Sequence, residues 1–164
     1  AINWLTSYSL YADSLGDWFD KNVSGDWTNL RARFMALLSD EAALEEIVKL
    51  VGMDALSAPD RLKMETARSI REDFLHQLAY HEVDTYTTLK KQNYLMKLII
   101  EYYDRALEAL SAGADIEELA SLPVRESIGR FKYVRQEDID IELEKIQQQL
   151  VREIANSVNK REEQ

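Results

Sequence analysis

Residues 71–86 read Arg71-Glu-Asp-Phe-Leu-His-Gln-Leu-Ala-Tyr-His-Glu-Val-Asp-Thr-Tyr86. The stretch begins with the spacing of an amphipathic helix and ends in polar and aromatic residues without a helical period. It carries both histidines of the chain together with tyrosines and carboxylates, and a long helical pattern lies on either side of it. We therefore expect the fold to be organised around this stretch, and we expect a small ligand, if one binds, to bind here.

Upstream of this stretch, apolar residues recur at intervals of three or four, which predicts helices over residues 2–22, 26–51 and 59–78. Ser39-Asp40-Glu41 could interrupt the second helix, because Ser39 could cap a new one. Residues suited to helix ends mark the other boundaries: Asp26, Ser57 or Ala58 as N-caps, Pro59 at a first helical position, and Gly52 as a stop. The expected inward-facing residues are Leu30, Phe34, Leu37, Leu38, Leu44, Ile47, Val48, Val51, Leu62, Ala67, Ile70, Phe74, Leu75 and Leu78. The expected wet face of the third helix holds Arg68, Arg71, Glu72 and Asp73.

The first expected helix is the most aromatic part of the chain, with Trp4, Tyr8, Tyr11 and Trp18. These rings could pack the helix on the main body or form a platform for an aromatic ligand. Packing is the favoured interpretation, because buried rings serve it far more often.

Downstream, residues 80–88 are expected to form a loop, since two threonines disfavour helix. The next helix is expected to start near Leu89 and to end at Gly113, followed by short helices over 116–121 and from Leu122 to Gly129. Residues 131–134 have strand-like composition, and a last helix runs from about 135. The inward-facing residues of the two long helices are Leu95, Leu98, Ile99, Tyr102, Ala106, Leu107, Leu110, Ile139, Leu143, Ile146, Leu150, Ile154 and Val158. The prediction is a single all-α domain, a multi-helix bundle of about six or seven helices spanning residues 1–164.

Composition restricts the classes of partner. Hydrophobic residues make up 46% of the 164 residues, and five glycines and two prolines are few for a turn-rich β fold. The net charge of −10 disfavours nucleic acid and makes a basic protein partner more plausible. The chain has no cysteine, so thiol chemistry and disulfides are excluded. No apolar run approaches the ~20 residues that span a bilayer, so direct membrane insertion is not expected.

The chain opens with Ala1-Ile-Asn-Trp-Leu5, already inside an apolar pattern and without methionine. We expect the sequence to be an excised fragment of a longer protein, with any upstream domain absent here.

Motifs for self-contained chemistry are missing. Neither a GxxxxGK[ST] nor a GxGxxG loop occurs, and no GxSxG turn supports a serine nucleophile. His76 and His81, with Glu82 and Asp84, have the residue types of a metal site, but their spacing matches no common ligand pattern. No metal site and no catalytic residue is therefore predicted within the chain.

Charged side chains offer two weaker candidates. The carboxylate pairs Glu45-Glu46, Glu117-Glu118 and Glu162-Glu163 are typical of solvated helix faces. Arg125, Arg130, Lys132 and Arg135 form a modest basic cluster that could meet an acidic partner or offset nearby acids, and the second interpretation is favoured.

Several collinear segments go beyond periodicity. They are Ala1–Tyr11, Glu46–Leu56, Arg71–Leu75, Glu82–Tyr86 and Leu122–Arg130. Together they resemble the C-terminal domain of the catalytic A subunit (alpha chain) of archaeal and vacuolar-type rotary ATP synthases, with the archaeal branch the better fit. The resemblance covers nearly the whole chain.

The resemblance implies that a nucleotide-binding domain upstream, absent here, carries the phosphate loop and binds ATP or ADP with Mg. The fragment itself would hold no cofactor and be inactive alone. Tyr80 would lie beside the adenine, with His81 next to it where the family commonly has an acid. Thr87-Thr88-Leu89 departs from the family's Cys-Pro-Pro.

The same resemblance implies a turn that faces the rotor, formed by Ser111, Ala112, Gly113, Glu118, Ser121 and Arg125. The implied partners are the remainder of the same subunit, neighbouring B subunits and the central stalk subunit. The implied location is the cytoplasmic side, peripheral to the cell membrane, in the head of a complex that moves protons or sodium ions. The alternative is a free-standing acidic helical adaptor that binds a basic protein.

Overall fold

The computed structural model describes residues 25–75 and 86–162. These residues form α2 (Trp27–Val51), η1 (Met53–Ala55), α3 (Ala58–Ser69), the π-helical η2 (Ile70–Leu75), α5 (Tyr86–Ser111), α6 (Ile116–Ala120), α7 (Pro123–Arg130), η3 (Phe131–Tyr133), η4 (Gln136–Asp138) and α8 (Ile139–Glu162). No strand occurs among them, which confirms the all-α prediction. The expected number of helices is slightly off for this part of the chain. Five of its α-helices have eight residues or more, and α6, with five, is little more than one turn.

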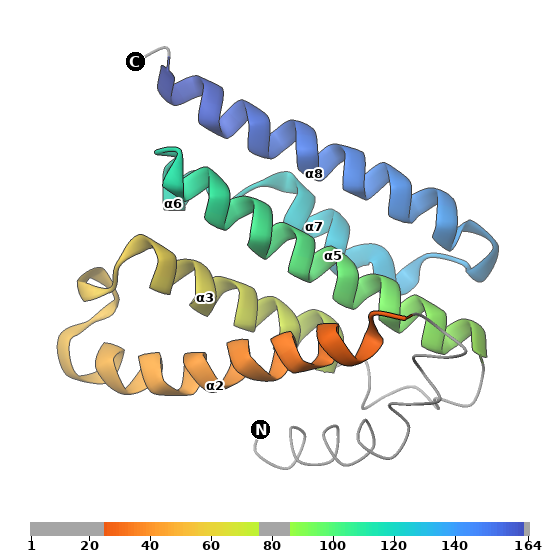
Figure 1. The fold of residues 1–164 in the computed structure, drawn as a ribbon, viewed down its shortest axis with the longest axis horizontal. Coiled ribbons are helices and arrows are strands. Elements are labelled where there is room, and N and C mark those ends of the chain that lie inside the picture. Colours follow the sequence, from red (N-terminus) through yellow and green to blue (C-terminus); the bar gives the residue numbers. More distant parts are fainter. Residues whose placement is uncertain (1–24, 76–85, 163–164) are drawn as a thin grey trace.

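Helix α5 lies at the centre of the bundle and contacts α2, α3, α7 and α8. In Figure 1, α2, α5 and α8 run in one direction, and α3 and α7 return in the other. The core between them is apolar, and its fully buried members include Phe34, Leu62, Met96 and Leu150. Burying such side chains removes apolar area from water, which holds the helices together.

Helix ends follow the expected residues in most places. The Oγ of Ser57 accepts a hydrogen bond from the backbone N–H of Asp60 at 3.3 Å, so Ser57 is the N-cap of α3. Gly52 ends α2 with a φ of 86°. Gly113 follows α5 with a φ of 99°, its N–H donates to the carbonyl of Leu110, and the N–H of Ala114 donates to the carbonyl of Ala109. This is the hydrogen-bond pattern of a Schellman motif, which explains the glycine.

The possible interruption at Ser39-Asp40-Glu41 does not occur, because α2 is continuous from Trp27 to Val51. Glu41 is 6% exposed and accepts two hydrogen bonds from the guanidinium of Arg71, at 3.0 and 2.6 Å. Its carboxylate serves tertiary packing across the helix hairpin rather than the first turn of a new helix.

Ile47 and Val51 were expected to face inward, but they are 45% and 63% exposed. Arg33 of α2 pairs with Asp104 of α5, and the two helices run parallel. Helix α5 ends at Ser111, seven residues after Asp104, so the last turns of α2 extend past the helix that would cover them.

Other helix boundaries also differ from those predicted from the sequence. Helix α5 begins at Tyr86, so the threonines at 87 and 88 are helical. The lower helix propensity of threonine amounts to only a few tenths of a kcal/mol per residue, which is a weak preference. Helix α7 continues through Gly129 to Arg130, and the strand-like segment is the 3-10 turn η3, anchored by the buried Phe131. Helix α8 starts at Ile139 after η4 rather than at 135.

Candidate functional site

The predicted adenine-side residues Tyr80 and His81 lie outside the described residues, as do His76 and the expected first helix. The residues predicted to face a rotor are all described. They belong to the end of α5, the following turn, α6 and the start of α7.

The surface of this turn is formed by Ser111, Ala112 and Ser121, which are exposed. Ser121 is tied back to the chain, since its Oγ donates to the carbonyls of Glu117 at 2.9 Å and Glu118 at 3.2 Å. The Glu118 carboxylate lies 3.2 Å from the Nζ of Lys160 on α8. The turn is therefore an ordered surface, held by its own backbone and by the last helix.

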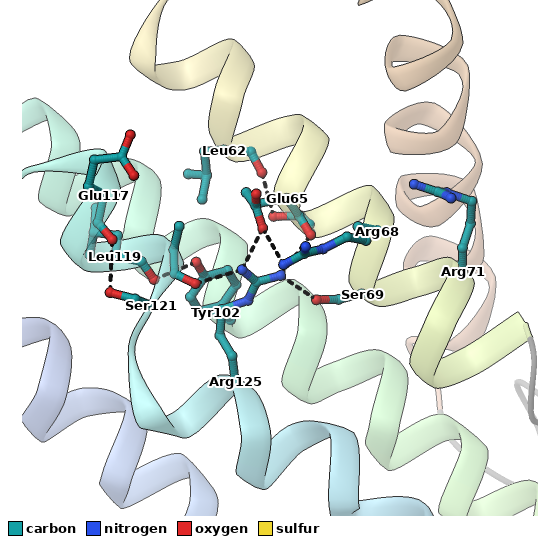
Figure 2. Close-up of polar contacts among 12 residues, drawn as sticks. Leu62, Glu65, Arg68, Ser69, Arg71, Tyr102, Glu117, Leu119, Ser121 and Arg125 are labelled. Atoms are coloured by element: carbon teal, nitrogen blue, oxygen red, sulfur yellow. Dashed lines mark hydrogen bonds and ion pairs between the residues drawn. The ribbon is translucent and has the colours of Figure 1, made fainter. Parts of the chain in front are cut away.

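Arg125 differs from the other members of this set because its side chain is only 12% exposed. Figure 2 shows it directed into the bundle, toward α3. Its Nη1 donates to Oε2 of Glu65 at 2.7 Å and to the carbonyl of Ala120 at 2.8 Å. Its Nη2 donates to the carbonyl of Glu65 at 2.9 Å and to Oγ of Ser69 at 2.8 Å. Arg125 thus joins α3, α6 and α7 and does not belong to the exposed surface of the turn.

Tyr102 of α5 contacts this junction with both its ring and its hydroxyl. The guanidinium carbon of Arg125 lies 5.4 Å from the centre of the Tyr102 ring, within the range of a cation–π contact. The Tyr102 hydroxyl donates to the carbonyl of Leu119 at 2.8 Å. Burial raises the pKa of Tyr102 to about 12, so the hydroxyl remains a donor at neutral pH.

The other end of α7 is also joined to the α3 side of the bundle. A Cβ added at Gly129 would lie 3.1 Å from Oδ1 of Asp73, on η2. Lys132 Nζ lies 3.9 Å from the same oxygen. Asp73 is 19% exposed and not on the wet face where it was expected, because α7 packs over it at its glycine. Burial raises its pKa, and the charge of Lys132 opposes that rise.

Most of the basic cluster is paired within the chain. Besides Arg125 and Lys132, Arg130 lies 3.4 Å from the carboxylate of Glu126. For these three residues, the structure favours the interpretation that basic residues offset nearby acids.

Sequence reasoning missed an apolar surface at the same end of the bundle as the turn. Leu50, Val51 and Met53 are 85%, 63% and 42% exposed. Arg61, near the start of α3, forms an ion pair with Glu117 of α6, so the helix that follows this apolar surface in the chain is linked to α6. The helical period made Val51 look buried, and only the length of the covering helix could have corrected this.

Within 25–75 and 86–162, no group of three His, Asp or Glu side chains is arranged to hold a metal ion. No helix in this part of the chain combines the length and apolar character needed to cross a membrane.

Comparison with known proteins identifies the class of this bundle. Residues 16–120 match the family described as the C-terminal domain of V and A type ATP synthase. The match covers more than half of the 164 residues, and the chain belongs to this family.

Individual relatives agree. The V-type ATP synthase alpha chain of Acetivibrio thermocellus is 54% identical over 154 residues, which are 94% of this chain and 26% of the relative. The alpha chain of Clostridium botulinum strain Hall is 56% identical over 140 residues, 85% of this chain and 24% of the relative. That of Thermoanaerobacter pseudethanolicus is 54% identical over 157 residues, 92% and 27% respectively. The chain therefore spans about a quarter of the length of the curated relatives it matches.

Proposed function

We propose that this chain is the part of a rotary ATP synthase alpha subunit that links the state of the nucleotide to the position of the central stalk. Family membership supports the setting, since the relatives are named V-type ATP synthase alpha chains. In this proposal the longer subunit binds ATP or ADP with Mg through its upstream domain, works in a head peripheral to the membrane, and contacts neighbouring B subunits. The chain alone would not hydrolyse ATP, because its sequence has no phosphate loop.

The observation that carries the proposal is the end of the bundle at which both α2 and α5 end (Figure 1). The ordered turn around Ala112 follows α5, and the exposed side chains of Leu50 and Val51 lie at the end of α2. Nearby in the chain, the ion pair between Arg61 and Glu117 links α3 to α6. Adjacent exposed apolar side chains indicate an interaction surface. The pairing with Glu117, together with Asp54 and Asp115, raises the pKa of Arg61, so carboxylates lie near the start of α3 at this end of the chain's hairpin. A shaft with apolar and basic side chains would fit such a surface.

The bundle itself suits this role. Close-packed helices have low compressibility and transmit displacement. A push on the end that carries Ala112 would move α3, α5 and α7 together.

For the nucleotide side, we propose that Tyr80 offers its ring to the adenine and that His81 lies nearby. Replacing Tyr80 with Ala in the intact subunit should weaken nucleotide binding, measured by titration with a fluorescent ATP analogue. Unchanged affinity would remove Tyr80 from the proposal.

The stalk side is tested by replacing Leu50 with Gln in the assembled complex. Because Leu50 is 85% exposed, the fold should be unaffected, while binding of the stalk subunit to the head should weaken. Normal assembly and normal ATP-driven rotation in that variant would argue against a stalk contact at this surface.

A further inference from the structure

Arg125 has an arrangement that the rotor-facing role does not explain. Its side chain points away from the exposed turn, and its four hydrogen bonds end on three positions of two other helices (Figure 2). Two of the acceptors are backbone carbonyls, those of Glu65 and Ala120. A bond to a carbonyl fixes the position of the chain itself and not only of a side chain.

The acceptors lie at the ends of their helices. Ala120 is the last residue of α6, where carbonyls lack intrahelical partners. Glu65 and Ser69 belong to the last turns of α3, and η2 begins at the next residue, Ile70. The guanidinium therefore sets the distance between the α6–α7 turn and the start of the π-helical segment.

The chemistry of this junction is specific for arginine. A guanidinium presents its donors in a fixed plane and can bind several acceptors at set angles. The ammonium of a lysine is a single point charge with rotatable donors. It therefore cannot reach the carbonyl of Ala120, the hydroxyl of Ser69, and both the carboxylate and the backbone carbonyl of Glu65 together.

A second contact ties the opposite end of α7 to the same segment. Gly129 approaches Asp73 of η2 so closely that a Cβ would lie 3.1 Å from the carboxylate oxygen. Helix α7 is therefore joined to the α3–η2 side at both ends, by Arg125 at one and by Gly129 with Lys132 at the other.

From these contacts we propose that Arg125 is a positioning residue that makes the α6–α7 turn move together with the end of α3 and with η2. Its contribution to coupling rests on the proposed function, because it assumes that the turn receives displacement from the stalk. In the sequence, η2 ends five residues before Tyr80, which the proposed function assigns to the nucleotide side of the subunit.

The test uses the assembled ATP synthase in proteoliposomes. Arg125→Lys keeps the charge and removes the fork of donors. Glu153→Ala is the control, since the carboxylate of Glu153 on α8 accepts from the N–H of Val124 at 2.9 Å. This control loosens the start of α7 without touching its link to α3.

Two readouts are compared. Hydrogen exchange should rise about tenfold or more in Arg125→Lys in both the end of α3 and the end of α6, because both lose the same partner. The number of ions transported per ATP hydrolysed should fall by about half or more, while the KM for ATP stays unchanged. In Glu153→Ala, faster exchange should be confined to α7 and α8, with normal coupling.

The proposal is overturned if Arg125→Lys keeps normal ion transport per ATP, or if its faster exchange is limited to α7. Should that variant fail to assemble, Ser69→Ala removes one acceptor only, and it must show both changes at smaller size. Unchanged exchange and coupling in Ser69→Ala would then overturn the proposal. Failure of the stalk contact itself is a separate result, since it would appear as missing crosslinks from the turn whatever Arg125 does.

Discussion

Arg125 and Glu65, sixty residues apart in the sequence, are joined twice, through the carboxylate at 2.7 Å and through the backbone carbonyl at 2.9 Å. A side chain that was expected on the surface of a turn is thereby part of the interior junction of three helices. The same geometry separates two roles at this end of the bundle. Ala112, Ser121 and the apolar residues near Leu50 form the outer surface, and Arg125 holds the α6–α7 turn to α3.

Removing the carboxylate of Glu65 should destabilise the fold. Glu65→Ala removes the charged partner of the Arg125 guanidinium, which is mostly buried. We expect the free energy of unfolding to fall by about 2 kcal/mol. Urea denaturation of the chain measures it. The control is Glu126→Ala, whose pair with Arg130 is exposed and should change stability by about 0.5 kcal/mol or less. Equal losses in both variants would contradict the buried junction.

The hydroxyl of Tyr102 should contribute measurably, although the ring itself stays in the core. Tyr102→Phe leaves the carbonyl of Leu119 without its donor, which should cost about 1 kcal/mol. Tyr133→Phe is the matched control, because Tyr133 is 78% exposed. Thermal unfolding of the two variants compares them, and a Tyr102→Phe protein as stable as the control would show that the bond to Leu119 is unimportant.

Gly129 and Asp73 should be energetically coupled. Gly129→Ala gains roughly 1 kcal/mol of helix propensity but forces its Cβ against the Asp73 carboxylate, so we expect little or no net gain in the native protein. In an Asp73→Ala background the clash disappears, and the same change should stabilise by about 1 kcal/mol. A double-mutant cycle gives the coupling energy. Additive effects would mean that α7 does not rest on Asp73.

Asp73 should also impose a pH dependence on stability. Burial raises the pKa of Asp73 above its ordinary value of 3.8, so between these two values the folded chain binds more protons than the unfolded chain. Stability from this group is therefore lost as pH rises from 3.8 through the folded pKa.

Asp73→Asn removes this titration. Its stability relative to the native protein should increase as pH rises through that window and level off above it. Urea denaturation of both proteins over a pH series measures the difference. A relative stability that falls with rising pH would show that the pairing with Lys132, and not burial, governs this carboxyl.

The apolar period of the sequence was enough to predict the helical class and most of the core. Leu62, Leu95 and Leu150 are buried as expected, since a 3.6-residue period records which face of a helix is covered. The helix ends at Gly52 and Gly113 were also predictable, because glycine adopts a positive φ more readily than other residues. Both glycines do have a positive φ in the structure.

The sequence did not predict the partners of buried charged side chains, nor which apolar residues of α2 are left uncovered by other helices. Glu41 was assigned to the first turn of a possible new helix and Arg125 to a basic cluster in a turn, yet each has a partner thirty or sixty residues away that no local pattern reveals. Ile47 and Val51 follow the helical period but extend beyond the end of α5. The roles of Tyr80 and His81 stay predictions.

The central claim is that the end of the bundle around Ala112 contacts the central stalk. The 164 residues contain no cysteine, so a cysteine introduced among them is the only thiol in this part of the subunit, and the complex without the introduced cysteine gives the background. Ala112→Cys and Ser121→Cys, in an assembled complex that hydrolyses ATP, are treated with a short bifunctional reagent that joins thiols to amines. Arg130→Cys, 76% exposed at the far end of α7, is the control. We predict crosslinks to the stalk subunit from the first two positions and not from the third. No crosslink from either position, or equal crosslinking from Arg130→Cys, would contradict the account.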